Sequence, residues 1–281
     1  MDSLNIFFQE YDYAEAKQWL MDHEGFLLKC VAAYVVSIFS IKYVMSNKKP
    51  FDLNTPLILW NALLAVFSIA GFVQMTPTFV KICQQQGVQQ TYTKITELQT
   101  GKVAGYWAFL WVVSKIPELI DTLFIVARKK PLMLMHWYHH ALTGYFAFVN
   151  FYEDNAYSVW VVYMNYFIHS FMYSYYCARA MHFKIPPQFA QLLTGAQIVQ
   201  FVITHVVMGH LLYLLSTTHN KYDVTPKGYL IGAIMEVSYL LLWFRFYYIS
   251  YIRGGGKKYL AHVKATKGEN GTAKNGTAKL E

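Results

Sequence analysis

The sequence predicts an all-α protein that crosses a membrane several times. Charged residues make up 14% of the 281 residues and hydrophobic residues 55%. A soluble domain usually carries about 25% charged residues. The apolar residues gather in long stretches with short polar joints between them, and a stretch of roughly 20 apolar residues matches the thickness of a bilayer. A chain of this length accommodates one membrane domain and no large soluble domain beside it.

Seven candidate spans follow one another along the chain. Each is close to the ~20 residues that cross the hydrocarbon core, and prolines or basic clusters mark most joints. The spans are expected at 26–46, 57–80, 104–126, 134–152, 156–178, 188–215 and 229–251. The chain then divides into an N-terminal segment of residues 1–25, a seven-span domain of residues 26–253 and a tail of residues 254–281. The tail is rich in glycine and lysine and is expected to be disordered.

The basic residues of the joints predict the orientation. One set of joints, together with the tail, holds fourteen of them: Lys48, Lys49, Arg128, Lys129, Lys130, Arg179, Lys184, Arg253 and six lysines of the tail. The alternate set holds six: Lys17, Lys81, Lys94, Lys102, Lys221 and Lys227. Cytosolic loops carry the excess of Lys and Arg, so we expect a luminal N-terminus and a cytosolic C-terminus. The net charge of +8 follows from this topology, and we expect membrane lipid rather than nucleic acid as a partner.

Three ionisable residues lie inside the third expected span. Lys115, Glu118 and Asp121 are three residues apart and share one helix face. Charges inside a bilayer are costly and mark either a functional site or an internally satisfied network. An ion-pair network that locks helices together is therefore the plain alternative to a reactive site for this group.

A histidine box opens the fourth expected span. His136, His139 and His140 follow the spacing i, i+3, i+4, which places the three imidazoles on one side of a helix. A single histidine in an apolar helix is usually structural. Three on one face favour a chemical role.

Polar residues also form a stripe on each of the next two spans. The stripe on the fifth span consists of Asn165, His169, Tyr173 and Tyr176. The stripe on the sixth consists of Thr194, Gln197 and Gln200. Asparagine and glutamine often serve only as hydrogen-bonding contacts between helices, and that is the plain interpretation of the sixth-span stripe.

Other polar residues of the last two spans follow no pattern. We interpret His205, His210 and Glu236 as structural or luminal polar groups. Arg245, near the cytosolic end of the seventh span, would either snorkel to the membrane surface or contact an anionic ligand.

The stripes agree in depth. With a rise of 1.5 Å per residue, Glu118 and Asp121 lie about 12 and 8 Å from the cytosolic end of their span. His139 and His140 lie about 8–9 Å deep, and His169 lies at roughly 14 Å. Structural polar groups scattered through a bundle would not be expected to share a level. We therefore predict a common site that is reached from the cytosol.

Metal chemistry is one use for such a site. Membrane desaturases and hydroxylases hold iron through several histidine boxes, whereas this chain supplies a single box. Zinc would accept three histidines and a carboxylate, but His139 and His140 point about 100° apart on a helix, which makes joint ligation awkward. A metal-dependent lipid desaturase or hydroxylase remains an alternative. We expect no metal and, because the sequence has no glycine-rich phosphate loop, no nucleotide cofactor.

Acyl transfer without a metal fits the residues better. A neutral imidazole is a good nucleophile and general base near neutral pH, and burial disfavours the imidazolium. Glu118 or Asp121 could orient an imidazole by accepting its other N–H. His169 and Asn165 could donate hydrogen bonds to an oxyanion. Cys177, near the cytosolic end of the fifth span, is an alternative nucleophile.

A seven-helix receptor or transporter is the non-enzyme alternative, since its span number and orientation match. A receptor has little need for an imidazole triplet near the cytosolic surface. A transporter more often shows internal repeats and broken helices, and this sequence has no clear repeat.

The motifs occur in an order that resembles a known family. Four motifs follow one another: Lys115-x-x-Glu118-x-x-Asp121-Thr122, His136-Trp137-Tyr138-His139-His140, Asn165-x-x-x-His169-x-x-Met172-Tyr173-x-Tyr175-Tyr176 and Thr194-x-x-Gln197-x-x-Gln200. Together they resemble the very-long-chain fatty acid elongases, the endoplasmic-reticulum 3-ketoacyl-CoA synthases, over roughly residues 1–255. The Trp-Tyr pair inside the box resembles the branch that elongates saturated, monounsaturated or branched chains near sixteen carbons.

The resemblance implies an activity and a set of catalytic residues. Malonyl-CoA would condense with a long-chain acyl-CoA to 3-ketoacyl-CoA, with release of carbon dioxide and CoA and without a cofactor. The order would be ping-pong, through an acyl-imidazole on His139. His169 would contact the malonyl-derived fragment, and Asn165 would support its oxyanion. The orienting residues would be Glu118, Asp121, His136, His140 and Gln197.

Substrate-binding residues are expected in the tunnel and at its mouth. They are Lys115, Tyr173, Tyr176, Gln197, Gln200, Arg179, Arg245 and Arg253. A ring of basic residues at the mouth could meet the CoA phosphates, although topology alone accounts for most of their charge. The ring is expected to consist of Arg128, Lys129, Lys130, Arg179, Lys184 and Arg253.

The resemblance also implies a fold and a location. Spans 2 to 7 would form a six-helix barrel around a tunnel that is open to the cytosol and closed toward the lumen, with span 1 packed outside. The protein would lie in the endoplasmic reticulum membrane. Its partners would be the ketoacyl-CoA reductase, the dehydratase and the enoyl-CoA reductase of the elongation cycle, and a homodimer is left open.

Overall fold

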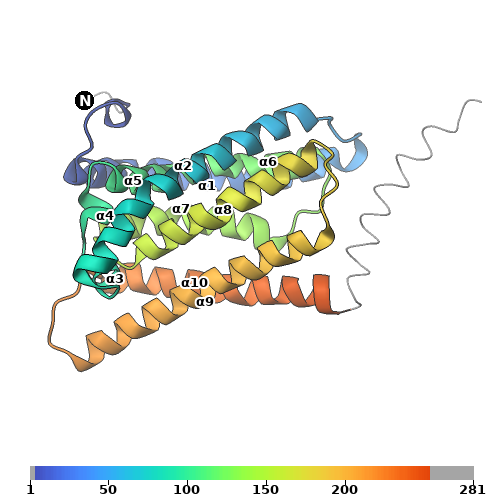
Figure 1. Cartoon of the computed structure of the whole chain (residues 1–281). Coiled ribbons are helices and arrows are strands. Elements are labelled where there is room, and N and C mark those ends of the chain that lie inside the picture. The colour runs from blue at the N-terminus through green and yellow to red at the C-terminus, as the bar shows by residue number, and fades with distance from the viewer. Residues whose placement is uncertain (1–3, 254–281) are drawn as a thin grey trace, which may run out of the picture.

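The structure is a computed structural model that describes residues 4–253. Within that range every regular element is a helix. The long helices run side by side along one axis of the molecule (Figure 1). They are α1 (Tyr13–Val44), α2 (Asn54–Gln86), α7 (Leu134–Tyr152), α8 (Ser158–Ala180), α9 (Pro187–Thr217) and α10 (Pro226–Tyr247). The predicted tail of residues 254–281 lies outside the described residues.

The all-α prediction is confirmed for the described residues, whereas the predicted number of spans is not. Between residues 4 and 253, four helices are long and apolar enough to cross a membrane: α1 with its short extension (Tyr13–Asn47), α2, α9, and α10 with the π-helical turn after it (Pro226–Ile252). The other predicted spans fall short for two reasons. The third is divided into short helices, and α7 and α8 carry buried histidine, asparagine and tyrosine side chains that lower their hydropathy.

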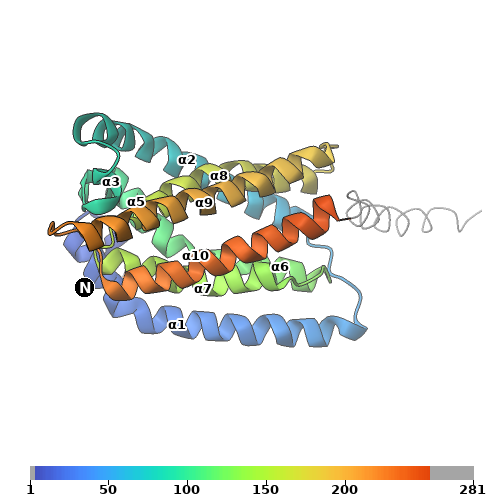
Figure 2. The same ribbon diagram turned by 90° about the horizontal axis from the view of Figure 1, so that it is seen from below.

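The first helix begins at Tyr13, well before the predicted start of the first span at residue 26. Asp12 caps it, because the Asp12 carboxylate accepts a hydrogen bond from the backbone N–H of Glu15 at 2.9 Å. The helix packs against α6 and α7 through a seam of buried residues, and it lies at the outer edge of the bundle (Figure 2). The buried residues of α1 are Ala16, Leu20, Leu27, Tyr34 and Ile38.

The third predicted span is broken in the middle. The helix α5 (Ala104–Ser114) ends before Lys115, a 3-10 turn follows at Pro117–Leu119, and α6 (Ile120–Ala127) continues to the end of the span. Proline lacks a backbone N–H and cannot continue an α-helical ladder, so the break falls where Pro117 stands. The break lies within the motif that carries Lys115, Glu118 and Asp121.

Close backbone approaches join α10 to the connection between α7 and α8. A Cβ atom on Gly228 would lie 2.1 Å from the Asn155 amide nitrogen, and one on Gly232 would lie 2.2 Å from the Tyr157 hydroxyl. Only glycine leaves room for these contacts. The Tyr157 hydroxyl bonds to Asn150 at 2.7 Å and to the Gly228 carbonyl at 2.9 Å. These contacts hold the N-terminal end of α10 against the connection between α7 and α8.

Candidate functional site

A cavity of about 620 Å³ lies between the helices. This volume is within the usual range of small-molecule sites, about 300–1,000 Å³. Side chains from α2, α6, α7, α8, α9 and α10 line it, and α1 contributes none of the lining residues. Basic side chains line it where α6 and α8 end, and we call this group the basic mouth. The basic mouth consists of Arg128, Lys130, Arg179 and His182.

Most of the predicted site residues line this one cavity, as the agreement in depth predicts. The lining includes Asp121, His136, His139, His140, Asn165, His169, Tyr173, Tyr176, Arg179, Gln197 and Gln200. Lys115 and Glu118 are buried behind the wall instead. Arg245 and Arg253 are exposed and do not line the cavity. The seemingly separate stripes of α7, α8 and α9 therefore belong to one site.

The histidines of the box point in different directions. The His139 ring packs against the rings of Tyr239 and Trp243 on α10, with centroids 4.9 and 5.5 Å apart. The His140 ring lies 4.5 Å from that of His136 and is turned toward α6. His136 Nε2 is buried without a hydrogen-bond partner in the described part of the chain. His139 therefore faces α10, and His140 faces the carboxylate of α6.

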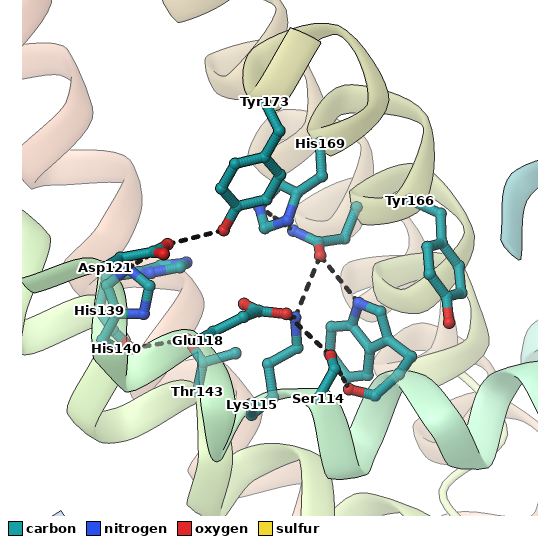
Figure 3. Close-up of polar contacts among 12 residues, drawn as sticks. Ser114, Lys115, Glu118, Asp121, His139, His140, Thr143, Tyr166, His169 and Tyr173 are labelled. Carbon is teal, nitrogen blue, oxygen red and sulfur yellow. Dashed lines mark hydrogen bonds and ion pairs between the residues drawn. The ribbon is translucent and has the colours of Figure 1, made fainter. Parts of the chain in front are cut away.

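Asp121 gathers contacts from three helices. The Trp60 indole of α2 donates to Oδ1 at 2.5 Å. The Tyr173 hydroxyl of α8 donates to Oδ2 at 2.8 Å (Figure 3). His140 Nε2 lies 3.8 Å from the same Oδ2, beyond hydrogen-bond length. Asp121 is thus the carboxylate closest to an imidazole, but that imidazole belongs to His140 and not to His139.

Glu118 is satisfied without a histidine. Its Oε1 accepts hydrogen bonds from the Ser114 hydroxyl at 2.8 Å and from the Lys115 ammonium group at 2.7 Å. The two charged side chains are each 4% exposed. Removing one partner of such a buried pair typically costs about 3–5 kcal/mol, because the other charge is left uncompensated. The ion pair is local to one segment of the chain, so the contacts of Glu118 satisfy its charge without joining it to another helix.

The Asn165 amide connects α5 to His169. The Trp111 indole donates to Oδ1 of Asn165 at 2.8 Å, and Nζ of Lys115 lies 3.5 Å from the same oxygen. Nδ2 of Asn165 lies 3.0 Å from Nε2 of His169. The dashed contacts of Figure 3 trace this path from Lys115, the residue that follows α5, to His169.

Gln197 joins three helices at the wall. Its Oε1 accepts a hydrogen bond from the Trp243 indole at 3.0 Å, and its amide nitrogen lies 3.4 Å from the Met172 sulfur. Gln200 is buried one turn further along α9 and lines the cavity. Gln197 therefore forms hydrogen bonds between helices, as glutamine often does in membrane proteins, and it also lines the cavity.

The residues without a pattern lie outside the cavity lining. His210 bonds to the Tyr92 hydroxyl at 2.6 Å, and His205 bonds to the Phe201 carbonyl of its own helix at 2.7 Å. Glu236 is 1% exposed. Cys177 does not line the cavity either, and its thiol contacts the Ile58 carbonyl at 3.7 Å. Within residues 4–253, no three His, Cys, Asp or Glu side chains gather as a metal-ligand set.

Sequence reasoning missed the aromatic side chains that hold the motif residues. Trp60, Trp111 and Trp243 each donate an indole N–H to a motif side chain, and Tyr239 donates to the His139 backbone. A signal was available, because tryptophans usually gather at the membrane surface. A tryptophan buried inside a span needs a hydrogen-bond partner, and the polar stripes supply it.

Comparison with known proteins gives one consistent result. Residues 19–259 match the GNS1/SUR4 family (ELO). The chain is 40% identical over 252 residues to long chain fatty acid elongase 1 of Caenorhabditis elegans, covering 89% of this chain and 87% of that protein. It is 34% identical over 252 residues to very long chain fatty acid elongase 6 of Homo sapiens, covering 87% of this chain and 93% of that protein. Very long chain fatty acid elongase 6 of Drosophila melanogaster is 31% identical to it over 253 residues, covering 90% of this chain and 80% of that protein.

Proposed function

The chain belongs to the GNS1/SUR4 family, and from that membership we propose that it is the condensing enzyme of fatty acid elongation, a very-long-chain 3-oxoacyl-CoA synthase. The observation that carries the proposal is that the histidines of two helices, His139 and His169, line one cavity together. The substrates are a long-chain acyl-CoA and malonyl-CoA. The relatives named as fatty acid elongases support this substrate class.

The reaction has two halves. In the first, a His139 nitrogen attacks the acyl thioester, the carbon–sulfur bond breaks, and CoA leaves as the thiol with the imidazole proton. In the second, malonyl-CoA loses carbon dioxide, and the electron pair of the broken carbon–carbon bond forms an enolate. The enolate attacks the acyl carbonyl carbon, and the bond to the imidazole breaks. The imidazole nitrogen that leaves takes up a proton from water, and 3-ketoacyl-CoA is released. His169 stabilises the negative oxygen of the enolate.

The seven-span fold remains part of the proposal. Spans 2 to 7 form the barrel, the first span packs outside it, and the cavity opens to the cytosol. The lining supports this arrangement, because it draws on every long helix except α1. The basic mouth supports the orientation, since cytosolic ends carry the basic excess and CoA phosphates need cationic partners.

The acyl chain is saturated, monounsaturated or branched and near sixteen carbons long. The Trp-Tyr pair of the box supports this class, although neither residue lines the cavity. Trp137 packs against Phe39 of α1 at 5.5 Å, and the Tyr138 hydroxyl bonds to Ser238 of α10 at 3.2 Å. The pair therefore acts on selectivity through the packing of α7. The proposed location is the endoplasmic reticulum, with the reductases and the dehydratase of the elongation cycle as partners.

A decarboxylation assay tests the proposal. Purified protein receives acyl-CoA and malonyl-CoA labelled in its free carboxyl group, and we expect labelled carbon dioxide together with 3-ketoacyl-CoA. A receptor or transporter would release neither, and that outcome would overturn the proposal. Metal analysis of the active protein tests the desaturase alternative, which requires stoichiometric iron and loss of activity with chelators.

A further inference from the structure

A buried chain of hydrogen bonds runs from α5 to His169. It passes from Trp111 and Lys115 to Oδ1 of Asn165, at 2.8 and 3.5 Å, and from Nδ2 of Asn165 to Nε2 of His169 at 3.0 Å. None of these four residues is more than 8% exposed. These side chains are therefore held mainly by contacts within the protein, and each donor along the chain has to face an acceptor.

The donors fix the direction of each bond in this chain. An indole N–H and an ammonium group donate and offer no lone pair. The Asn165 oxygen must therefore face Trp111 and Lys115, so its NH₂ group faces His169. An amide NH₂ group only donates, so Nε2 of His169 accepts and carries no proton. In a neutral imidazole the single proton then lies on Nδ1.

We propose that Trp111 is a positioning residue that holds His169 in its Nδ1–H tautomer through Asn165. Nδ1 of His169 has no hydrogen-bond partner within residues 4–253, and His169 lines the cavity. Nδ1–H is thus the group that His169 offers to a ligand. His169 meets that ligand as a hydrogen-bond donor.

The consequence for catalysis rests on the proposed condensation. A donor at Nδ1 suits the enolate oxygen that forms when the malonyl group loses carbon dioxide. Both ends of the Asn165 amide are bound within the protein, so Asn165 acts through His169 and not directly on the substrate. This differs from the direct oxyanion contact that the family resemblance implies for Asn165.

Nitrogen-15 spectra of histidine-labelled protein in nanodiscs test the tautomer. Protonated and unprotonated imidazole nitrogens resonate in separate ranges, and comparison with His169→Gln assigns the His169 signals. We expect a proton on Nδ1 in the unsubstituted protein and a mixture of tautomers in Trp111→Phe. Protonation at Nε2 in the unsubstituted protein would overturn the proposal, and so would an unchanged Nδ1–H tautomer in Trp111→Phe. No substrate is present, so this outcome is independent of whether the protein condenses its proposed substrates.

Kinetics provide the second readout. Loss of one hydrogen bond should lower kcat about threefold to tenfold in Trp111→Phe, with the KM for acyl-CoA unchanged. Trp107→Phe is the matched control on the same helix, because Trp107 packs on Phe67 and Tyr166 and does not belong to the chain of hydrogen bonds that leads to His169. It should leave both constants unchanged.

A double variant distinguishes an effect of Trp111 through the hydrogen bonds of Asn165 from an effect through packing. In an Asn165→Ala background, Trp111→Phe should have no further effect on kcat, because the path to His169 is already broken. If the two losses simply add, Trp111 acts through packing alone and the positioning role is wrong.

Discussion

The ring of Tyr239 lies 4.9 Å from the ring of His139, and the Tyr239 hydroxyl donates to the backbone carbonyl of His139 at 2.9 Å. The Thr143 hydroxyl lies 2.7 Å from the same carbonyl oxygen and 2.9 Å from the Tyr239 hydroxyl, so these two hydroxyl groups share two protons among three contacts. One residue of α10 thus contacts both the backbone and the side chain of the proposed nucleophile.

Removing this hydroxyl should slow acylation. Tyr239→Phe keeps the ring contact and loses the hydroxyl that contacts the His139 carbonyl and Thr143, at a cost of about 1–2 kcal/mol in the free energy of unfolding. We expect the rate of acyl-enzyme formation, measured by rapid quench, to fall roughly tenfold. Tyr229→Phe is the control, because the Tyr229 hydroxyl bonds to the Met208 carbonyl away from the cavity lining. Equal acylation rates in the two variants would contradict the positioning of His139 by Tyr239.

The nucleophile assignment predicts a covalent adduct. His139→Ala should abolish the hydroxylamine-sensitive acyl group that labelled acyl-CoA leaves on the protein, because no imidazole remains at that place to accept it. His205→Ala should retain the adduct, since His205 bonds only within its own helix. Gel or mass-spectrometric detection of the labelled protein measures both. Retention of the adduct in His139→Ala would show that the nucleophile is another residue.

The contacts of Asp121 predict a cost for its amide analogue. Asp121→Asn offers one acceptor oxygen where Trp60 and Tyr173 both donate, so one buried donor faces an NH₂ group. A buried donor without a partner costs about 1–3 kcal/mol. We expect a lower Tm in detergent and reduced condensation. Adding Tyr173→Phe removes the unmatched donor and should restore part of the lost Tm, and a further fall would show that the clash lies elsewhere.

The basic mouth predicts a salt-dependent KM. Arg128→Glu and Arg179→Glu should each raise the KM for acyl-CoA, because the CoA phosphates then meet a negative charge. The KM of the unsubstituted protein should rise with ionic strength, and that dependence should weaken in the variants. Arg245→Glu and Lys184→Glu are controls, as neither residue lines the cavity. A larger effect at Arg245 than at Arg179 would restore the predicted role of Arg245 in substrate binding.

An aromatic cluster beside the cavity predicts a change in product length. Phe201 lines the cavity, and its ring lies 5.2 Å from that of Trp243 and 5.9 Å from that of Tyr239. Phe201→Ala opens space at the deepest lining position of α9, so products should lengthen by at least one elongation step. Phe171→Ala, at an exposed position of α8, should leave the product profile unchanged. Chromatography of the 3-ketoacyl products over a panel of acyl-CoA lengths measures both.

Helical periodicity was sufficient to predict the helices that carry the histidines. The bounds of α7 agree with the predicted fourth span, and α8 begins and ends two residues after the predicted fifth. Agreement in depth also predicted that the polar faces meet, and they line one cavity. These features follow from the rise and turn of a helix, which are local properties. The start of α1 was missed because Asp12 caps a helix well outside the apolar stretch.

Pairing between helices was not predictable in the same way. Whether Asp121 reaches His139 or His140 depends on the 3-10 turn at Pro117–Leu119, which changes the direction of α6 relative to α5. The indole donors of Trp60 and Trp111 lie 61 and 54 residues from their acceptors along the chain. No periodicity within one span contains that information. Arg245 was predicted to bind substrate because it lies near the cytosolic end of its helix. It lies instead on an exposed side of α10 and does not line the cavity.

The absence of α1 from the cavity wall has a practical consequence for work on this protein. Val36 and Tyr43 on its outer surface are 66% and 81% exposed, and neither lines the cavity. A fluorophore attached at Tyr43, near the end of α1, would therefore report on the protein from a position outside the cavity lining.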